Sequence, residues 1–140
     1  MDAFDAGVLI YAAVPGHLLG ERVRALFPAA APTTTGTVAG IGSVLLIPAL
    51  LTKPMRDGAE SEIEALAVLL GRLDLRPVDE AVAELAAALG AAHGLRAADA
   101  VHLATAVAAG ADRFITNNSS DFSKNITEAE VIHPDELPEP

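Results

Sequence analysis

Short apolar segments alternate with amphipathic stretches along the chain, which predicts strands alternating with helices. The apolar segment 4–10 predicts a strand that runs directly into a helix, and periodicity does not separate the two. Residues 17–27 have helical spacing. Residues 33–38 are rich in Thr and Val and predict a short strand, whereas the apolar run 43–51 contains Pro48 and predicts a short or kinked helix.

The second half of the chain continues the alternation. Asp57 resembles the N-cap of a helix whose apolar positions extend to Leu73. A brief strand is expected at 75–78. Asp79 then caps a further helix, and Gly94 lies where that helix should stop.

Three more elements complete the pattern, a helix at 97–109 closed by Gly110, a buried strand at 113–116 and a last short strand at 130–133. The alternation predicts an α/β fold with a helix-covered parallel sheet. Sites in such sheets form at the carboxyl ends of the strands. With 140 residues, the chain has the length of one domain spanning 1–140.

Composition narrows the function classes. The chain has no cysteine, which excludes disulfides and thiolate metal sites and fits a cytoplasmic protein. We expect no signal peptide and no membrane span, because the start is acidic and no apolar run is long enough. The net charge is −10, which opposes binding to nucleic acid unless metal ions supply positive charge at the site.

Three isolated acids lie in or beside apolar segments, where a carboxylate is unfavourable without a partner. Asp5 follows a strand, Asp99 falls in the first turn of a helix, and Asp121 follows a polar loop after a strand. Each alone is also explained as a helix cap, a first-turn acid or a turn residue. Together they predict an oxygen-ligand site for Mg²⁺ or Mn²⁺. His102 is expected to be structural, because the histidines lack zinc-site spacing.

Three motifs stand out along the chain. The first lies at 4–12 (FDAGVLIYA), the second at 94–106 (GLRAADAVHLATA) and the third at 112–122 (DRFITNNSSDF). All three resemble motifs of one family, the PIN-domain ribonucleases of the VapC toxin type. The second is the most specific, since it resembles the pattern GLR..DA.HLATA. Motif order and spacing agree across nearly the whole chain.

The resemblance implies a PIN-like three-layer α/β/α sandwich around a parallel sheet. It implies an endoribonuclease that depends on Mg²⁺ or Mn²⁺ and cleaves structured RNA such as tRNA or rRNA. It also implies a VapB-type antitoxin and a toxin homodimer. Asp5, Asp99 and Asp121 match family acids, while Thr116 and Asn118 match supporting positions near the metal.

One position departs from the family. The stretch 43–54 (SVLLIPALLTKP) resembles the motif S.LL.PE.L.KP, and Ala49 occupies the position of its metal-site Glu. We therefore expect an attenuated or inactive nuclease. Gly7 also replaces a residue that is often polar in the family.

Two alternatives remain open. The chain could be an inactive PIN scaffold that only binds an antitoxin. It could also be a haloacid dehalogenase-type phosphatase, although that chemistry needs an acid where Gly7 stands. The acidic excess suits an amphipathic antitoxin helix carrying Arg or Lys. Six basic residues could line the rim of the site and meet RNA, namely Arg22, Arg24, Lys53, Arg56, Arg96 and Lys124.

Overall fold

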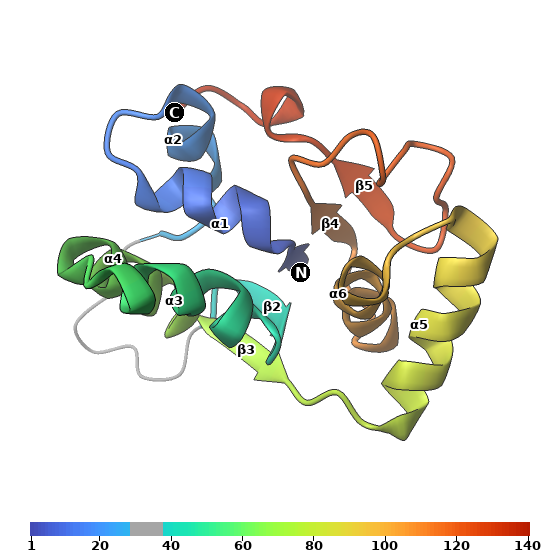
Figure 1. The fold of residues 1–140 in the computed structure, drawn as a ribbon. Coiled ribbons are helices and arrows are strands. Elements are labelled where there is room, and N and C mark those ends of the chain that lie inside the picture. The colour runs from blue at the N-terminus through green and yellow to red at the C-terminus, as the bar shows by residue number, and fades with distance from the viewer. Residues whose placement is uncertain (29–37) are drawn as a thin grey trace.

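Five parallel strands form one sheet at the centre of the computed structural model, which describes residues 1–28 and 38–140. The strand order is β3-β2-β1-β4-β5, so the first strand lies in the middle (Figure 1). This arrangement confirms the predicted parallel sheet. The strands are β1 (Asp2–Phe4), β2 (Gly40–Ser43), β3 (Leu73–Arg76), β4 (Arg113–Ile115) and β5 (Glu130–Ile132).

Helices cover both faces of the sheet and complete the predicted three-layer α/β/α fold (Figure 1). One apolar core joins the sheet to the first four helices, and a second joins it to the last two. The helices are α1 (Ala6–Ala13), α2 (Leu18–Arg24), α3 (Leu46–Asp57), α4 (Glu60–Leu70), α5 (Glu80–His93), α6 (Ala97–Ala108) and the 3₁₀ turn η1 (Pro134–Glu136). None of the helices in these described segments is long and apolar enough to cross a membrane.

The register of β1 against β4 positions the functional edge of the sheet. Phe4 pairs with Ile115, so the residues that follow them, Asp5 and Thr116, leave the sheet side by side. At the other end of the same pair, Arg113 donates two hydrogen bonds of 2.8 Å to the Asp2 carboxylate. This cross-strand ion pair fixes the register from which the site is built.

The sequence predicted several element boundaries correctly. Asp79 accepts a hydrogen bond from the amide of Val82 and caps α5, and Gly94 ends that helix with φ +67°. Asp99 lies in the first turn of α6, as expected. These boundaries depend on local capping chemistry, which sequence patterns report directly.

Other boundaries were wrong. Asp57 is the last residue of α3 and not a cap, because Gly58 ends that helix in the left-handed region with φ +66°. Leu73 begins β3 instead of ending a helix, so the expected strand at 75–78 lies two residues too late. The strand expected at 33–38 falls largely on residues 29–37, outside the described residues, and the adjacent strand of the structure is β2.

Candidate functional site

Asp5 lies at the junction between β1 and α1 and is almost fully buried, with 6% of its surface exposed. Its Oδ1 accepts a hydrogen bond of 2.9 Å from the amide of Ala6, which caps the helix. Its Oδ2 accepts a hydrogen bond of 2.8 Å from the Thr116 hydroxyl. Asp5 is therefore the cap of α1. Each of its carboxylate oxygens retains a further lone pair, so the same side chain is still a candidate metal ligand.

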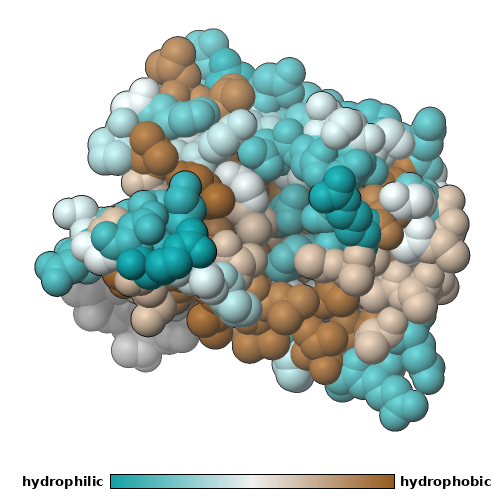
Figure 2. Space-filling view, in the orientation of Figure 1, coloured by the Kyte–Doolittle hydropathy of each residue, from teal (hydrophilic) through white to brown (hydrophobic). Residues whose placement is uncertain are grey.

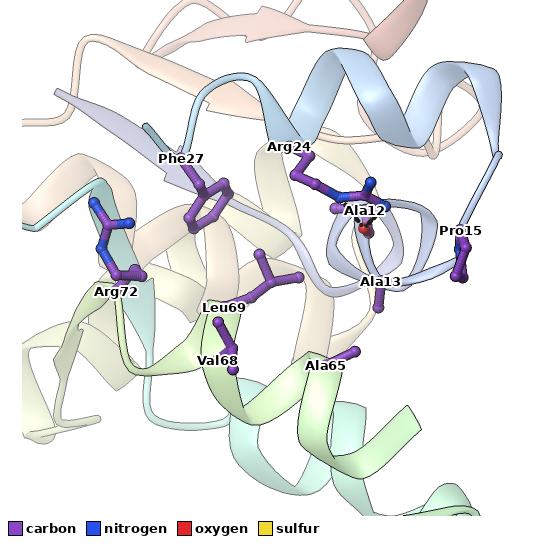
Figure 3. Close-up of a pocket in the computed structure, with 9 residues that line it drawn as sticks. All are labelled: Ala12, Ala13, Pro15, Arg24, Phe27, Ala65, Val68, Leu69 and Arg72. Atoms are coloured by element: carbon purple, nitrogen blue, oxygen red, sulfur yellow. Dashed lines mark hydrogen bonds between the residues drawn. The ribbon is translucent and has the colours of Figure 1, made fainter. Parts of the chain in front are cut away.

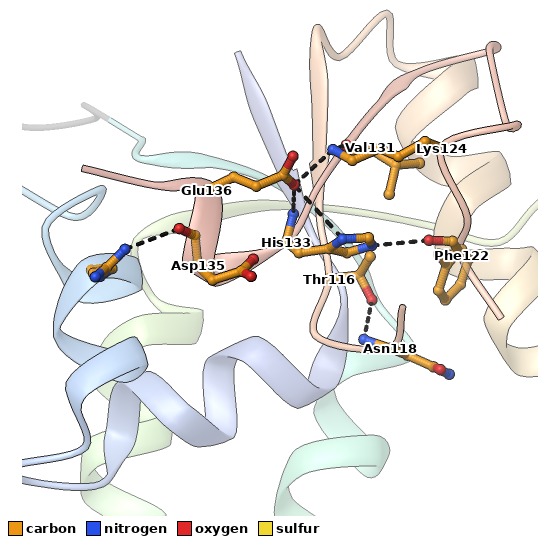
Figure 4. Close-up of polar contacts among 9 residues, drawn as sticks. Thr116, Asn118, Phe122, Lys124, Val131, His133, Asp135 and Glu136 are labelled. Atoms are coloured by element: carbon orange, nitrogen blue, oxygen red, sulfur yellow. Dashed lines mark hydrogen bonds and ion pairs between the residues drawn. The ribbon is translucent and has the colours of Figure 1, made fainter. Parts of the chain in front are cut away.

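The loop after β4 connects Asp5 to Asp121 through two polar side chains. The Thr116 hydroxyl is fully buried, donates to Asp5 and accepts a hydrogen bond of 3.1 Å from the amide of Asn118. Figure 4 shows this Thr116–Asn118 contact. The Asn118 side chain in turn donates to Asp121 Oδ2 at 2.8 Å, and its Oδ1 accepts from the amide of Asp121 at 3.2 Å. Both supporting residues named from the resemblance therefore contact a candidate acid.

Asp99 reaches the same region from α6 and is half-buried. Burial, together with the charges of Asp5 and Asp121, raises the pKa of the Asp99 carboxyl. His102 and Arg96 oppose this shift. The three acids therefore lie close enough for their charges to interact, although they come from separate parts of the chain.

The three carboxylates would suit a hard divalent cation, because oxygen donors with water completing the octahedron are what Mg²⁺ prefers. Their mutual repulsion is the electrostatic situation that a cation relieves. However, within the described segments the ligand atoms of these three acids do not all lie within 4.8 Å of one another. The chemistry of the donor set therefore suits a hard cation, while the side chains as they stand are not gathered into one coordination sphere.

A second group of possible ligands, His133, Asp135 and Glu136, does meet that 4.8 Å spacing. Glu136, however, already accepts hydrogen bonds of 2.6 Å from Lys124 Nζ and 2.7 Å from the amide of His133 (Figure 4). These contacts hold the pKa of Glu136 below its usual range, the amide of His133 contributing most. Since Lys124 supplies the positive charge, the group is an ion-pair cluster that anchors η1.

His102 is packed in the interior, with 5% of its surface exposed. Burial lowers its pKa, against the opposing influence of Asp5 and Asp99. Its Nδ1 has no hydrogen-bond partner among the residues that the structure describes. The neutral imidazole is therefore favoured.

Ala49 lies near the start of α3, directly after β2, the neighbour of β1 in the sheet. Because parallel strands end at the same edge, this position belongs to the edge that carries Asp5. The Ala49 side chain is exposed, so a longer side chain there would have room.

Most of the basic residues expected at the rim are engaged elsewhere. Arg22 donates to the carbonyl oxygens of Asp135 and Leu137, and Arg24 donates to the carbonyl of Ala12. Within segments 1–28 and 38–140, Lys53 and Arg96 make no hydrogen bond or ion pair, and Arg96 lies close enough to lower the pKa of Asp99. The expected basic rim is thus reduced mainly to these two residues.

Asn117 is a site residue that the sequence analysis missed. A Cβ atom at position 7 would lie 2.2 Å from Asn117 Oδ1, so the Asn117 amide occupies the space that a side chain at Gly7 would fill. The sequence did contain one signal for Asn117, the glycine at position 7 where the family often has a polar residue. A glycine two residues after Asp5 leaves room for another side chain to pack there.

Comparison with known proteins agrees with this architecture. The family model described as "PIN domain" matches residues 3–125. A chain of a toxin–antitoxin complex from Klebsiella pneumoniae has a similar fold, with a TM-score of 0.74, 21% identity and coverage of 96% of this chain and 98% of that one. A chain of VapBC2 from Rickettsia felis, solved bound to a DNA fragment from their promoter, has a TM-score of 0.64 at 16% identity, covering 94% and 97%. No curated protein matches the chain in sequence.

The raised pKa of Asp99 predicts a stability effect with a defined sign. Because the folded state holds this proton more tightly than the unfolded state, stability is lost as pH rises through the folded pKa. In the presence of a chelator at pH 7, Asp99→Asn should therefore raise the melting temperature, and the gain should vanish below the ordinary pKa of aspartate. Thermal unfolding across pH measures this.

Glu64→Gln, an exposed carboxylate in α4, is the matched control and should leave the melting temperature unchanged. A lower melting temperature for Asp99→Asn at pH 7 would contradict the repulsion among the three acids.

Proposed function

Because the chain belongs to the PIN domain family, we propose that it is the VapC-type toxin of a toxin–antitoxin pair, an endoribonuclease that uses Mg²⁺ or Mn²⁺ to cleave structured RNA such as tRNA or rRNA. Members of this family are generally nucleases that use divalent metals. The proposal is supported by the chain of hydrogen bonds that joins Asp5 to Asp121 through Thr116 and Asn118, and by the charges of these two acids raising the pKa of Asp99. The whole chain, in this proposal, is one cytoplasmic domain.

Each residue of the site has a proposed part. Thr116 holds the Asp5 carboxylate in one orientation, and Asn118 does the same for Asp121. Asp99 completes the acid cluster from the start of α6, where the helix dipole opposes the burial and the neighbouring charges that raise its pKa. Asp5, Asp99 and Asp121 would hold the divalent ion. When bound, this ion would polarise the scissile phosphate and lower the pKa of an attacking water.

Lys53 and Arg96 are the proposed contacts to the RNA backbone. Of the basic side chains in the described segments they are the two without an ion pair or hydrogen bond. Arg96 lies within electrostatic reach of Asp99, so a phosphate bound by Arg96 would lie beside the acids. With a net charge of −10, the site depends on such local cations and on the metal to attract RNA.

Ala49 makes the proposed enzyme attenuated. A family member with Glu at this position would add a carboxylate at the same edge of the sheet, and this chain offers only a methyl group there. Fewer anionic ligands mean weaker ion binding. The alternative of an inactive, antitoxin-binding scaffold rests on this same residue. The phosphatase alternative is not retained, because the chain belongs to the PIN family and Gly7 cannot transfer a proton.

Restoring the acid tests the enzymatic proposal. Ala49→Glu should increase RNA cleavage in Mn²⁺ by about 10–100-fold, the range by which groups around a metal centre alter activity. The measurement is cleavage of tRNA and rRNA fragments with and without the metal.

Ala49→Gln serves as the control of similar size without the charge and should give no such gain. Adding Asp99→Asn to Ala49→Glu should remove the activity. No gain from Ala49→Glu in either metal would leave the binding-module alternative as the better account.

An apolar groove supports the proposed antitoxin partner. It has a volume of about 450 Å³ and lies between α1, the end of α2 and α4 (Figure 3). Ala12, Phe27, Val68 and Leu69 are among the residues that line it, and Val68 is 68% exposed. An amphipathic helix bound there would lie along α1, the helix whose N-cap is Asp5. Because Ala12 and Ala13 at the C-terminal end of α1 line the groove, the partner chain would have to extend along α1 to reach Asp5 at the other end.

We predict that an Arg or Lys of the antitoxin lies against Asp5 and Asp99. Replacing that residue with Ala should weaken the complex by at least about tenfold, because it leaves buried carboxylates without a cation. Calorimetry on the toxin and its cognate antitoxin measures the loss. A structure of the complex with no cationic side chain near the two acids would contradict this prediction.

A homodimer is also proposed. Figure 2 shows apolar side chains gathered around the start of α3 and the end of β3. Val44 and Ile47, 38% and 40% exposed, lie just before and in the first turn of α3. Ile47→Glu should convert a dimer into a monomer in light scattering, whereas Val68→Glu in the groove should not. A parent chain that is monomeric at micromolar concentration would refute the proposed dimer.

A further inference from the structure

Tyr11 is the one aromatic side chain outside the apolar core. The chain has four Phe, one Tyr and no Trp, and all four Phe rings are buried. Tyr11 is only partly buried and stacks on His17, with ring centroids 4.2 Å apart and an angle of 25° between the planes. His17 is fixed in turn, because its Nδ1 accepts a hydrogen bond from the amide of Gly20 and caps α2. The tyrosine ring is thus held in place at the surface without serving the core.

A small pocket lies against Tyr11. Its volume is about 220 Å³, below the range of about 300–1,000 Å³ typical of sites for whole small molecules. Besides Tyr11 it is lined by Leu19, Asn117, Ser119, His133, Pro134 and Asp135. His17 is not among the lining residues, so it supports Tyr11 from outside. The tyrosine ring, two aliphatic side chains and several hydrogen-bonding groups suit a single planar polar ring.

The pocket and the acid cluster share the loop after β4. Thr116 bonds Asp5 and Asn118 bonds Asp121, while Asn117, between them, turns to the pocket and packs against Gly7. Gly7 and Tyr11 are one helical turn apart on α1, so Asn117 reaches the pocket beside the tyrosine. A ring bound here would therefore be next to the nucleotide whose phosphate meets the acids.

We propose that this pocket binds a nucleobase of the RNA substrate adjacent to the scissile phosphate and selects a base that carries an exocyclic amino group. The inference rests on the proposed ribonuclease function and names the subsite that reads its substrate. Single-stranded bases bind proteins by stacking on aromatic rings and by hydrogen bonds at their edges. Tyr11 supplies the stacking surface, and Asn117 and Ser119 supply donors and acceptors.

Asp135 sets the selectivity. Its side chain is exposed, and among the described residues it has no hydrogen-bond donor, whereas its carbonyl is held by Arg22 at 3.0 Å. An ionised carboxylate only accepts hydrogen bonds, so it favours cytosine, adenine and guanine, which carry an exocyclic amino group, over uracil, which has no amino group and offers only its N3–H between two carbonyls. Lys124 neutralises the neighbouring Glu136, which leaves Asp135 as the acceptor at the pocket rim.

The single tyrosine allows a direct test of binding. Protein labelled with 3-fluorotyrosine gives one ¹⁹F resonance, since Tyr11 is the only tyrosine. Titration with the 5′-monophosphates of cytidine, adenosine and guanosine should shift this resonance saturably, and uridine monophosphate should bind at least about fivefold more weakly. Inorganic phosphate should give no shift. Equal affinity for all four nucleotides, no shift with any of them, or the same shift with phosphate alone would each overturn the proposal.

Two variants assign the selectivity. Asp135→Asn should remove the discrimination against uridine, and Asp57→Asn, at the far end of α3, should leave all affinities unchanged. In the Ala49→Glu background, Tyr11→Ala should lower kcat/KM for RNA about tenfold, while Tyr11→Phe retains activity because it keeps the ring. Unchanged discrimination in Asp135→Asn would overturn the role of that carboxylate.

The test separates this inference from the proposed function. RNA cleavage without any effect of nucleotides or of Tyr11→Ala would refute the subsite and leave the nuclease intact. Selective nucleotide binding without RNA cleavage by Ala49→Glu would support the subsite and refute the nuclease.

Discussion

The hydrogen bond from the Thr116 hydroxyl to the Asp5 carboxylate is the contact on which the site depends. It joins the two residues that leave the sheet next to each other because Phe4 pairs with Ile115. The hydroxyl also accepts from the amide of Asn118, so the conformation of the following loop is fixed by the same atom. In a buried position such a chain of hydrogen bonds is strong when complete and unfavourable when broken. The sheet register thereby determines where the acids of the loop lie.

The sequence predicted those parts of this arrangement that local chemistry decides. The cap at Asp79, the stop at Gly94 and the first-turn position of Asp99 each follow from residues within one helical turn. Strand β2 was missed because two of its four residues are glycine, which patterns read as a turn. The structure needs glycine there, since a Cβ at Gly40 would lie 2.5 Å from the carbonyl oxygen of Asp2 in the neighbouring strand. That reason is non-local and invisible in a single sequence.

The partners of the charged side chains were likewise not visible in the sequence, because they depend on non-local contacts. Sequence analysis could list basic residues but not their partners, and the structure directs Arg22 and Arg24 to backbone carbonyls that anchor η1 and α1. An arginine engaged with backbone carbonyls is a structural element and contributes little to an RNA-binding surface. The acids could be named individually from motifs. Their convergence depends on strand order, which places β1 between β2 and β4 although β4 follows more than one hundred residues later in the chain.

The negative charge of the molecule therefore acts differently on its two proposed partners. In the proposed function, RNA would have to overcome a net charge of −10 with few free cations to help, so its binding would rely on the metal and on contacts that do not depend on charge, such as stacking on Tyr11. A cationic antitoxin would be attracted by the same negative charge, and its Arg or Lys would neutralise the acids that the metal needs. Antitoxin and metal would then compete for one cluster of carboxylates. Inhibition would follow from replacement of the divalent ion by a side-chain cation, with no change of fold required.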